Sequence, residues 1–354
     1  MSIHQLWLDL ALSPTKTIRD YFRYCHEHEQ TPDRTSLTIY LNRINIRQRH
    51  SESPDLIAWL SEPDQGFLPY PDLPGQLRQL KDPPAGLFYQ GDEKLINERM
   101  IAVVGARKQT PAGAENCQQF AYQLAQSGLV IISGLASGAD TTAHTAALAA
   151  SERTVAILGQ GLDTCYPKSN SGLQGEIKRK GLLLSEYAPS ESVKAWQFPH
   201  RNRLISGLSD GVLVTEATIR SGSLITANLA AEQGKQVFAI PGDIQNQMVS
   251  GCHHLIREGA QLVSHPREIL AAIYWTEPPQ LELLRTEMDD KQFTKSEKKV
   301  LDALDRTPRH LDIIQARTEC ELTLVLDALF SLELKGMIIS SIDGYYKPNQ
   351  GDTC

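Results

Sequence analysis

The chain has 354 residues, of which 41% are hydrophobic and 22% are charged, and its formal net charge is −7. This is the composition of a globular protein, and no stretch reaches the roughly 18 uncharged apolar residues that would span a bilayer. The six cysteines are scattered without a C-x-x-C pair, which argues against a zinc site or a disulfide framework and predicts a cytoplasmic protein without membrane insertion.

The first part of the chain, residues 1–62, predicts a small helical domain. Apolar residues such as Leu6, Leu10 and Ile18 recur there at helical spacing. Residues 63–98 contain too many prolines for a long helix. Their aromatic side chains predict that this Pro-rich segment packs against the domain that follows.

Residues 99–275 alternate short apolar runs with helical segments. The runs lack polar alternation and are followed by Gly or Ser, as in parallel strands that are covered on both faces. The pattern indicates an α/β fold with an extended, doubly wound, mostly parallel Rossmann-like sheet. The predicted strands are IAVVGA (101–106), LVIISG (129–134), TVAILG (154–159), LLLSEY (182–187), GVLVTEA (211–217) and QVFAIPG (236–242).

The predicted loops at the carboxyl ends of these strands are rich in Gly, Ser, Thr and Arg, and they should converge on one edge of the sheet. Gly105 would let the backbone approach an anion closely, and Arg107 adds a permanent charge. Segment 198–209 is predicted to be one of these loops. The polar or glycine residues that the loops supply are Gly105, Arg107, Tyr166, Lys168, Asn170, Arg201, Asn202, Arg203, Arg220, Ser221, Gly222, Ser223 and Thr226.

The charge distribution is compatible with an anion-binding site in this core. Arg99 to Glu268 contain 15 Lys and Arg and 13 Asp and Glu, a net charge of +2, so the flanks carry −9. A core near neutrality can hold a basic pocket, although its bulk charge would steer an anion only weakly.

Each loop feature also has a structural interpretation. The VVGAR run lacks the G-x-G-x-x-G dinucleotide fingerprint, and the Ser-Gly-Ser loop could simply cap a helix. Arg201 and Arg203 could form ion pairs with Asp210 or Glu216, and His144 is expected to pack inside the fold. The convergence of several anion-compatible loops on one sheet edge nevertheless favours a binding site.

The carboxyl-terminal part predicts a linker at 276–290 and a winged-helix domain at 291–350. Three helical segments precede a hairpin with the predicted turn Asp343-Gly344. A helix that enters the major groove should not be acidic, because phosphate neutralisation supplies most non-specific affinity. We therefore interpret this domain as a protein-contact or regulatory module, since its third helix region holds Glu319, Glu321, Asp327 and Glu333 against Lys335.

The ordered blocks of residues 70–270 closely resemble the DNA-processing protein A family (DprA, also called Smf). They include IAVVGAR, SGLASGADTTAHTAAL, TVAILGQGLDTCYPKSN, FPHRNRLISGLSDGVLVTEA, SGSLITANLAAEQGKQVFAIPG and GCHHLIREGAQLV. The resemblance implies a SAM-like amino-terminal domain and a Rossmann-like core that binds single-stranded DNA during natural transformation. It also implies protection of incoming strands, a homodimer formed through the core, and loading of the RecA recombinase.

The resemblance carries over to individual positions of this sequence. Ala106 stands where the family usually has serine, and Ser137 stands where many relatives have a basic residue. It implies no cofactor, metal or catalytic residue. The implied single-stranded DNA-binding residues are Gly105, Ala106, Arg107, Lys168, Asn170, Arg201, Asn202, Arg203, Ser221, Gly222, Ser223 and Thr226.

Two other classes of function remain open at this point. Rossmann-like relatives with glycine-rich loops act as nucleoside-monophosphate phosphoribohydrolases, and Glu216 beside the Ser-Gly-Ser loop could be their catalytic acid. Against this, the Pro-Gly-Gly-x-Gly-Thr signature of those enzymes is missing. A scaffold that binds only proteins would explain the winged helix but not the basic strand ends.

Overall fold

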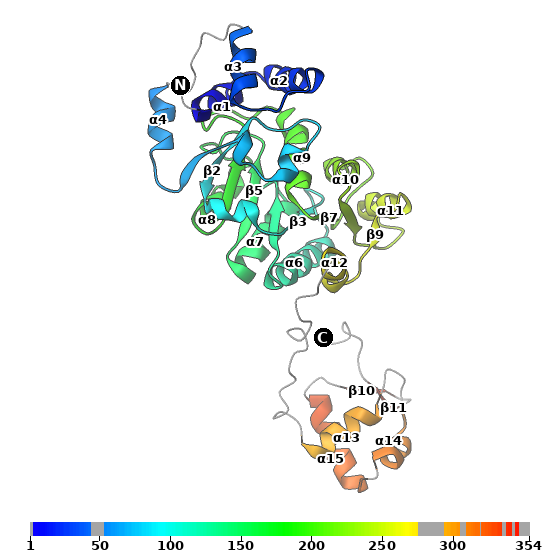
Figure 1. Cartoon of the computed structure of the whole chain (residues 1–354). Coiled ribbons are helices and arrows are strands. Elements are labelled where there is room, and N and C mark those ends of the chain that lie inside the picture. The colour runs from blue at the N-terminus through cyan, green and yellow to red at the C-terminus, as the bar shows by residue number, and fades with distance from the viewer. Residues whose placement is uncertain are drawn as a thin grey trace. The chain divides into compact units, whose positions relative to one another are not determined.

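The computed structural model describes residues 3–43, 53–274, 294–304, 309–318, 320–334, 338–341 and 344–346 (Figure 1). It divides into two compact units, Met1–Thr276 and Glu277–Cys354. The first unit holds the sheet and the amino-terminal helices, and the second holds a small helical fold with a hairpin.

The amino-terminal helices build their core around Trp7 and Tyr21, both fully buried. The ring of Trp7 also stacks on Tyr70 of the Pro-rich segment, with 5.1 Å between the ring centroids. Leu8 and Leu56 instead pack with residues of the main sheet. This region therefore shares its apolar contacts with the rest of the first unit. Its helices are α1 (Ile3–Ala11), α2 (Thr15–Glu27), α3 (Arg34–Arg43) and α4 (Pro54–Leu60).

The Pro-rich segment contributes two strands that were not predicted. Strands β1 (Gln65–Pro69) and β2 (Gly86–Gly91) form an antiparallel pair, and β2 also pairs antiparallel with β6 (Leu182–Ser185). Between them lie η2 (Tyr70–Asp72) and α5 (Gly75–Arg78). The prolines interrupt the segment locally, but the aromatic and apolar residues of the two strands extend the sheet at its edge.

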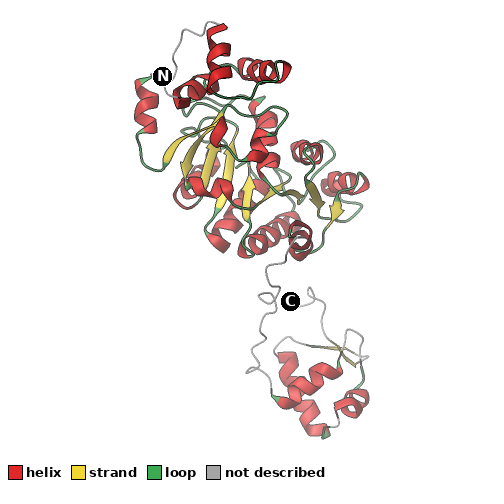
Figure 2. Ribbon diagram, viewed as in Figure 1, coloured by secondary structure: helices red, strands yellow, loops and turns green. Residues whose placement is uncertain are grey.

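The main sheet has nine strands among the described residues, in the order β1-β2-β6-β5-β4-β3-β7-β8-β9 (Figure 2). From β6 to β9 neighbouring strands are parallel, which confirms the predicted doubly wound Rossmann-like fold. The chain reverses its direction of winding between β3 and β7. The central and edge strands are β3 (Met100–Val104), β4 (Val130–Ser133), β5 (Thr154–Leu158), β7 (Gly211–Val214), β8 (Gln236–Ala239) and β9 (Gln261–Leu262).

Each central strand buries side chains on both of its faces. Met100, Ala102 and Val104 of β3 belong to one apolar cluster, and Ile101 and Val103 belong to another. This alternation explains why the strands are continuous apolar runs in the sequence. Helices α5, α9 (Gln197–Leu208), α10 (Gly222–Glu232) and α11 (Ser250–Arg257) cover the first face; α6 (Pro111–Gln126), α7 (Ala139–Ser151), α8 (Ser171–Lys180) and α12 (Pro266–Ile273) cover the second.

The prediction that segment 198–209 is a loop is wrong, because these residues form most of α9. Leu204, Ile205 and Leu208 recur at helical spacing and are buried against the sheet. The polar run Arg201-Asn202-Arg203 concealed this pattern in the sequence. The structural reason for the helix is the burial of its apolar stripe, which outweighs the polar residues between.

The second unit has the three helices and hairpin of a winged helix, α13 (Lys295–Ala303), α14 (Leu311–Thr318), α15 (Leu322–Leu334), β10 (Ile339–Ser341) and β11 (Gly344–Tyr346). Ser341 pairs with Gly344, so Gly344 lies in a strand and not in the predicted Asp343-Gly344 turn. Asp343 lies outside the described residues, as do Glu319 and Lys335 of the acidic set.

Candidate functional site

The point where the sheet changes its direction of winding lies between β3 and β7, and ligands of such folds bind beside the carboxyl ends of strands there. The loop after β3 is anchored by Glu216, which follows β7 and is 1% exposed. Its carboxylate accepts hydrogen bonds from the Thr110 backbone N–H (2.9 Å) and hydroxyl (2.7 Å). The Glu216 carbonyl accepts another from the Ala106 N–H at 2.7 Å. The loop is therefore held at both ends while Arg107 remains exposed.

This arrangement argues against the phosphoribohydrolase alternative. Glu216 is the acid that such a reaction would need, but both of its carboxylate oxygens are engaged by Thr110 and its side chain is buried. A Cβ atom on Gly113 would lie 2.4 Å from one of these oxygens, so the carboxylate is also closely covered. Glu216 holds the loop and is not presented to a substrate.

Close backbone packing joins the loops after β3 and β4. Gly138 has a φ of +78°, and a Cβ atom there would lie 2.3 Å from the Ala106 carbonyl oxygen. The Ala139 N–H donates to the same carbonyl at 3.1 Å. Both main-chain groups of Ala106 are thus used inside the protein, and its side chain is buried. Ala106 was predicted to bind DNA, but its backbone N–H already donates to Glu216, so it supports the loop and has no free N–H for a phosphate.

Arg201 is buried beneath this edge of the sheet. It donates through Nη1 to the carbonyl of Gly134 at 2.9 Å and to that of Ile157. Its charge faces Asp140, whose carboxylate accepts from the Gly134 and Ala136 N–H groups. Burial raises the pKa of Asp140, against the opposing effect of Arg201, and burial lowers the pKa of Arg201 to about 10. Arg201 therefore ties α9 to the ends of β4 and β5.

Arg203 points away from Arg201, as expected for residues two positions apart on a helix. Its Nη2 lies 2.7 Å from Oε1 of Glu186, and its Nε donates to the Asp82 carbonyl at 2.8 Å. His200 lies beside the same two acids, with Nε2 3.0 Å from the Asp82 carboxylate. Arg203 is thus part of a buried ionic network.

The structural alternative, an ion pair, is confirmed for Arg203, but with Glu186 and not with Asp210 or Glu216. Asp210 instead forms an ion pair with Arg99, at 3.1 Å. Glu216 bonds to Thr110, as described above. The acids that face Arg201 and Arg203 come from segments distant in the sequence, which local inspection does not reveal.

The loop after β5 carries two of the predicted residues, of which Lys168 is exposed and Asn170 is buried. Lys168 is exposed in the short 3-10 helix η4 (Lys168–Asn170). The Asn170 side chain is buried and donates to the Leu135 carbonyl (3.0 Å) and the Thr141 hydroxyl (2.9 Å). These bonds place the Lys168 loop beside the loop after β4.

The Ser-Gly-Ser loop forms the start of α10. Ser221 is the N-cap, and its hydroxyl accepts from the Ser223 N–H at 3.3 Å, which confirms the capping interpretation. Ser223 and Thr226 are buried, whereas Gly222 is exposed with no atom within 4 Å of a Cβ placed there. Ser221 and Gly222 are therefore the accessible members of this group.

The loops after β3, β5 and β7 also carry exposed cations that form no ion pair with described residues. Among the described residues, Arg107, Lys108, Lys168 and Arg220 form no ion pair. The positive charge of Arg107 contributes to lowering the pKa of Arg201, so the two guanidinium groups lie near each other. The hydrogen bonds between loops then link the segments that carry Arg107 and Lys168. The structure brings these two predicted residues to one edge, but buries Arg201 and Arg203 behind it.

Two exposed aromatic side chains come from the Lys168 loop and from the residue before α9. The ring of Tyr166, which is 44% exposed, lies 5.4 Å from Phe198. Trp196 is 50% exposed, and its ring lies 6.0 Å from both Tyr187 and His200. Trp196 is not among the residues predicted from the sequence, although an aromatic residue in the polar run SESVKAWQFPH is a signal for such a role.

His144 is fully buried, as expected, and its Nδ1 lies 2.8 Å from the Thr154 hydroxyl. The part of the chain that the structure describes contains no cluster of three or more His, Cys, Asp or Glu side chains placed to bind a metal. Its helices include none that is long and apolar enough to cross a membrane.

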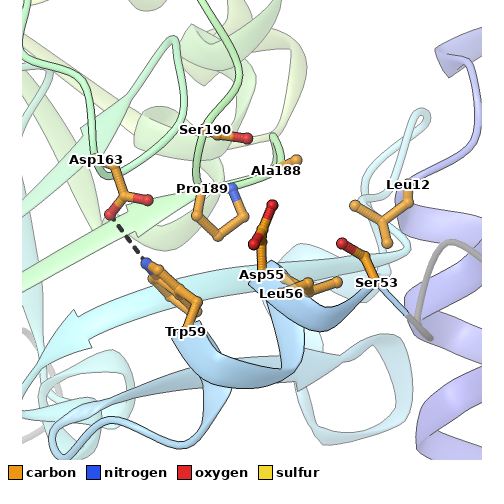
Figure 3. A pocket seen from close by; sticks show the side chains of 9 residues that line it. All are labelled: Leu12, Ser53, Asp55, Leu56, Trp59, Asp163, Ala188, Pro189 and Ser190. Atoms are coloured by element: carbon orange, nitrogen blue, oxygen red, sulfur yellow. Dashed lines mark hydrogen bonds between the residues drawn. The ribbon is translucent and has the colours of Figure 1, made fainter.

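A separate pocket of about 320 Å³ lies where α4 meets the loops after β5 and β6 (Figure 3). The Trp59 indole donates to Asp163 at 2.9 Å at its rim. The lining contains the carboxylates of Asp55 and Asp163 but no basic side chain. These negative charges would repel phosphate, so the pocket is not part of the candidate site.

The fold and this edge define a Rossmann-like protein with a winged-helix unit and a cationic strand-end site flanked by aromatic rings. Residues 67–274 match the model of the DNA recombination-mediator protein A family, and residues 285–343 match the DprA winged helix domain. The chain belongs to the DNA recombination-mediator protein A family (DprA/Smf). Members of this family are DNA-binding recombination mediators and not enzymes.

Proteins from several bacteria are similar in sequence to this chain. Protein Smf of Escherichia coli is 37% identical over 97% of this chain and 95% of its own length. DNA processing protein DprA of Streptococcus pneumoniae is 48% identical over 56% of this chain and 70% of its own length. A crystal structure of the latter covers 76% of this chain and 96% of that chain, with a TM-score of 0.63 and 38% identity.

The Helicobacter pylori DNA processing protein A has a solved structure concerned with its single-stranded DNA binding mode. It covers 59% of this chain and 95% of that chain, with a TM-score of 0.54 and 33% identity.

Proposed function

We propose that this chain binds single-stranded DNA at the carboxyl edge of its sheet and transfers it to the RecA recombinase during natural transformation. One observation carries the proposal: the loops after β3, β4 and β5 bring Arg107 and Lys168, exposed cations that form no ion pair with described residues, to one edge of the sheet, where the exposed ring of Tyr166 lies two residues before Lys168. A groove that combines cations with aromatic rings suits single strands, because phosphates and bases are bound together. The family membership supports the same ligand.

In this proposal phosphates contact Arg107, Lys168 and the accessible backbone of Ser221 and Gly222. Phosphate contacts carry no sequence information, so binding should tolerate any sequence and weaken with salt. Stacking on an aromatic ring contributes about 1–3 kcal/mol per base and favours single strands over duplex. Gly105, Ala106, Asn170, Arg201, Asn202, Arg203, Ser223 and Thr226 would act mainly by shaping the loops.

We further propose that the protein protects the bound strand and loads RecA onto it. It would do so in the cytoplasm, as a homodimer formed through the core. The edge strand β9 supports the dimer, because an open strand edge can pair with a second copy. Leu262 on this strand is 49% exposed. The winged-helix unit would contact protein, since Asp327 and Glu333 of α15 oppose binding to phosphate.

The test is fluorescence anisotropy with a labelled oligothymidine of about 35 nucleotides and a duplex of equal length at two salt concentrations. We expect tight, salt-sensitive binding of the single strand and weaker binding of the duplex. The absence of binding at micromolar protein and low salt would overturn the proposal. RecA filament formation on the bound strand, followed with and without the protein, tests the loading step.

A further inference from the structure

A groove of about 1220 Å³ lies apart from the carboxyl-edge loops and has no role in the site described so far. Helix α2, the segment from Tyr70 to Pro83, α9 and the end of α10 border it, and Figure 1 shows α2, α9 and α10 on the same side of the first unit. We call it the α2–α9 groove. Pro199 and His200 line it where α9 begins, and Lys235 lines it beyond the end of α10.

The lining of the α2–α9 groove is strongly basic. Six cations line it, against the two carboxylates of Asp82 and Glu232, an excess of four positive charges in a chain with a net charge of −7. Asp82 pairs with Arg19 and Glu186 pairs with Arg203, which accounts for part of this charge. The cations are Arg19, Arg23, Arg78, Lys81, Arg203 and Lys235.

Three of these cations form no ion pair inside the described part of the protein. They are Arg78 and Lys81, which are exposed, and Lys235, which is partly buried and feels the charge of Asp210. Like charges held together without acids repel one another, and a bound polyanion relieves this repulsion. The groove therefore has the electrostatic character of a polyanion-binding surface.

Aromatic rings line the same groove. Phe22 of α2 and Tyr70 lie with their ring centroids 5.0 Å apart, and both are partly exposed to it. Rings beside a basic track are suited to unpaired bases, because every base has a face that can stack. A partner recognised by charge alone would not need them.

Two pairs of aromatic rings involve the start of α9, which borders the groove. Tyr166, two residues before Lys168, contacts Phe198 at the start of α9. Trp196, two residues before Phe198, lies 6.0 Å from the ring of His200, which lines the groove. The start of α9 therefore has one ring in contact with the Lys168 loop and another, His200, whose side chain is 10% exposed and lines the groove.

We propose that the α2–α9 groove binds the continuation of the single strand held at the carboxyl edge, with phosphates on Arg78 and Lys81 and bases against Phe22 and Tyr70. This inference rests on the proposed function, since it requires a strand at that edge. The alternative occupant is an acidic protein segment. The rings of Phe22 and Tyr70 in the groove favour a nucleic acid strand, because a segment recognised by charge alone would not need them.

The test compares the wild type with the double variant Arg78→Glu/Lys81→Glu by fluorescence anisotropy. Two oligothymidines are used, one of about 6 nucleotides that fills only the carboxyl edge and one of about 30 that can also enter the groove. We expect the variant to bind the long strand about tenfold more weakly, with a salt slope lower by about 1.4, which corresponds to two lost phosphate contacts. Binding of the short strand should be unchanged.

The matched control is Lys178→Glu/Arg179→Glu on α8, which covers the opposite face of the sheet. It reverses the same number of charges and should leave binding of both strands within about twofold of the wild type. Retained binding of the short strand also shows that the groove variant is folded. A long-strand defect of equal size in both double variants would indicate a general charge effect and overturn the proposal.

Two further results would overturn it. One is a groove variant that binds both strands like the wild type. The other is a variant that loses only the binding of poly-L-glutamate, which would assign the groove to an acidic protein segment. If the wild type bound neither oligothymidine, the proposed function itself would fail, and that outcome is distinct from a defect confined to the long strand.

Discussion

The guanidinium of Arg203 and the carboxylate of Glu186 form an ion pair inside the first unit, with 2.7 Å between Nη2 and Oε1. The pair joins helix α9 to the residue that follows β6, and the Nε of Arg203 also reaches the Asp82 carbonyl. Three segments distant in the sequence therefore meet at one side chain. Because both ions are buried, Arg203 stabilises the fold and does not contact DNA at the sheet edge.

Replacing Arg203 with methionine should lower the free energy of unfolding by about 3–5 kcal/mol, because Glu186 is left buried without its cation. Urea unfolding followed by tryptophan fluorescence measures this. All four tryptophans lie within Met1–Thr276, so the signal reports on that unit. The double variant Arg203→Met/Glu186→Leu should regain most of the loss. A single variant as stable as the wild type would contradict the role given to the pair.

Replacing Gly134 with alanine should also destabilise the protein. A Cβ atom there would lie 2.4 Å from Nη2 of Arg201, so the guanidinium must move from its carbonyl partners. Overpacking of this kind costs about 1–3 kcal/mol. The control is Gly175→Ala in α8, where nothing lies within 4 Å and alanine should stabilise the helix by about 0.8–1 kcal/mol. Equal unfolding midpoints for both variants would show that the contact with Arg201 is unimportant.

The stability of the first unit should depend on pH through His144. Burial, followed by the nearby charge of Arg201, lowers the pKa of His144 to about 3 from the ordinary value of 6.5. Because the folded pKa lies below the unfolded one, the neutral ring stabilises the fold fully above pH 6.5, and this stabilisation is lost as the pH falls toward 3. Between pH 6.5 and 4 the loss should be about 3 kcal/mol.

The measurement is urea unfolding of the wild type and His144→Leu at pH 7, 5.5 and 4. The wild type should lose stability more steeply on acidification, because the variant has no ring to protonate on unfolding. If both proteins had the same pH dependence, another group would be responsible for it.

Arg107→Ala and Lys168→Ala should each weaken the binding of oligothymidine and lower its salt slope by about 0.7, because each removes one phosphate contact. Both side chains are exposed and form no ion pair with described residues, so the unfolding free energy should change by less than about 0.5 kcal/mol. Lys178→Ala on α8 serves as the control. A folded variant with wild-type affinity and salt slope would remove that residue from the site.

The central strands were predictable from the sequence because burial on both faces requires continuous apolar residues. The runs around Ile101, Ile131 and Val155 became β3, β4 and β5 as expected. Strands β1 and β2 were not predicted, because β1 pairs only with β2, and β2 joins the sheet through β6, which lies about one hundred residues later in the chain. Helix α9 was missed because its polar residues interrupt a stripe that only packing on the sheet reveals.

By itself the sequence determined the Rossmann-like core, the gathering of strand-end loops at one edge and the positions of Arg107 and Lys168 in those loops. These properties follow from local periodicity and from the rule that parallel strands end on the same side. Only the tertiary structure decided that Arg201 and Arg203 are buried, because their partners Asp140, Glu186 and Asp82 come from distant segments. Whether an arginine binds DNA or holds the fold together depends on which acids the chain brings beside it.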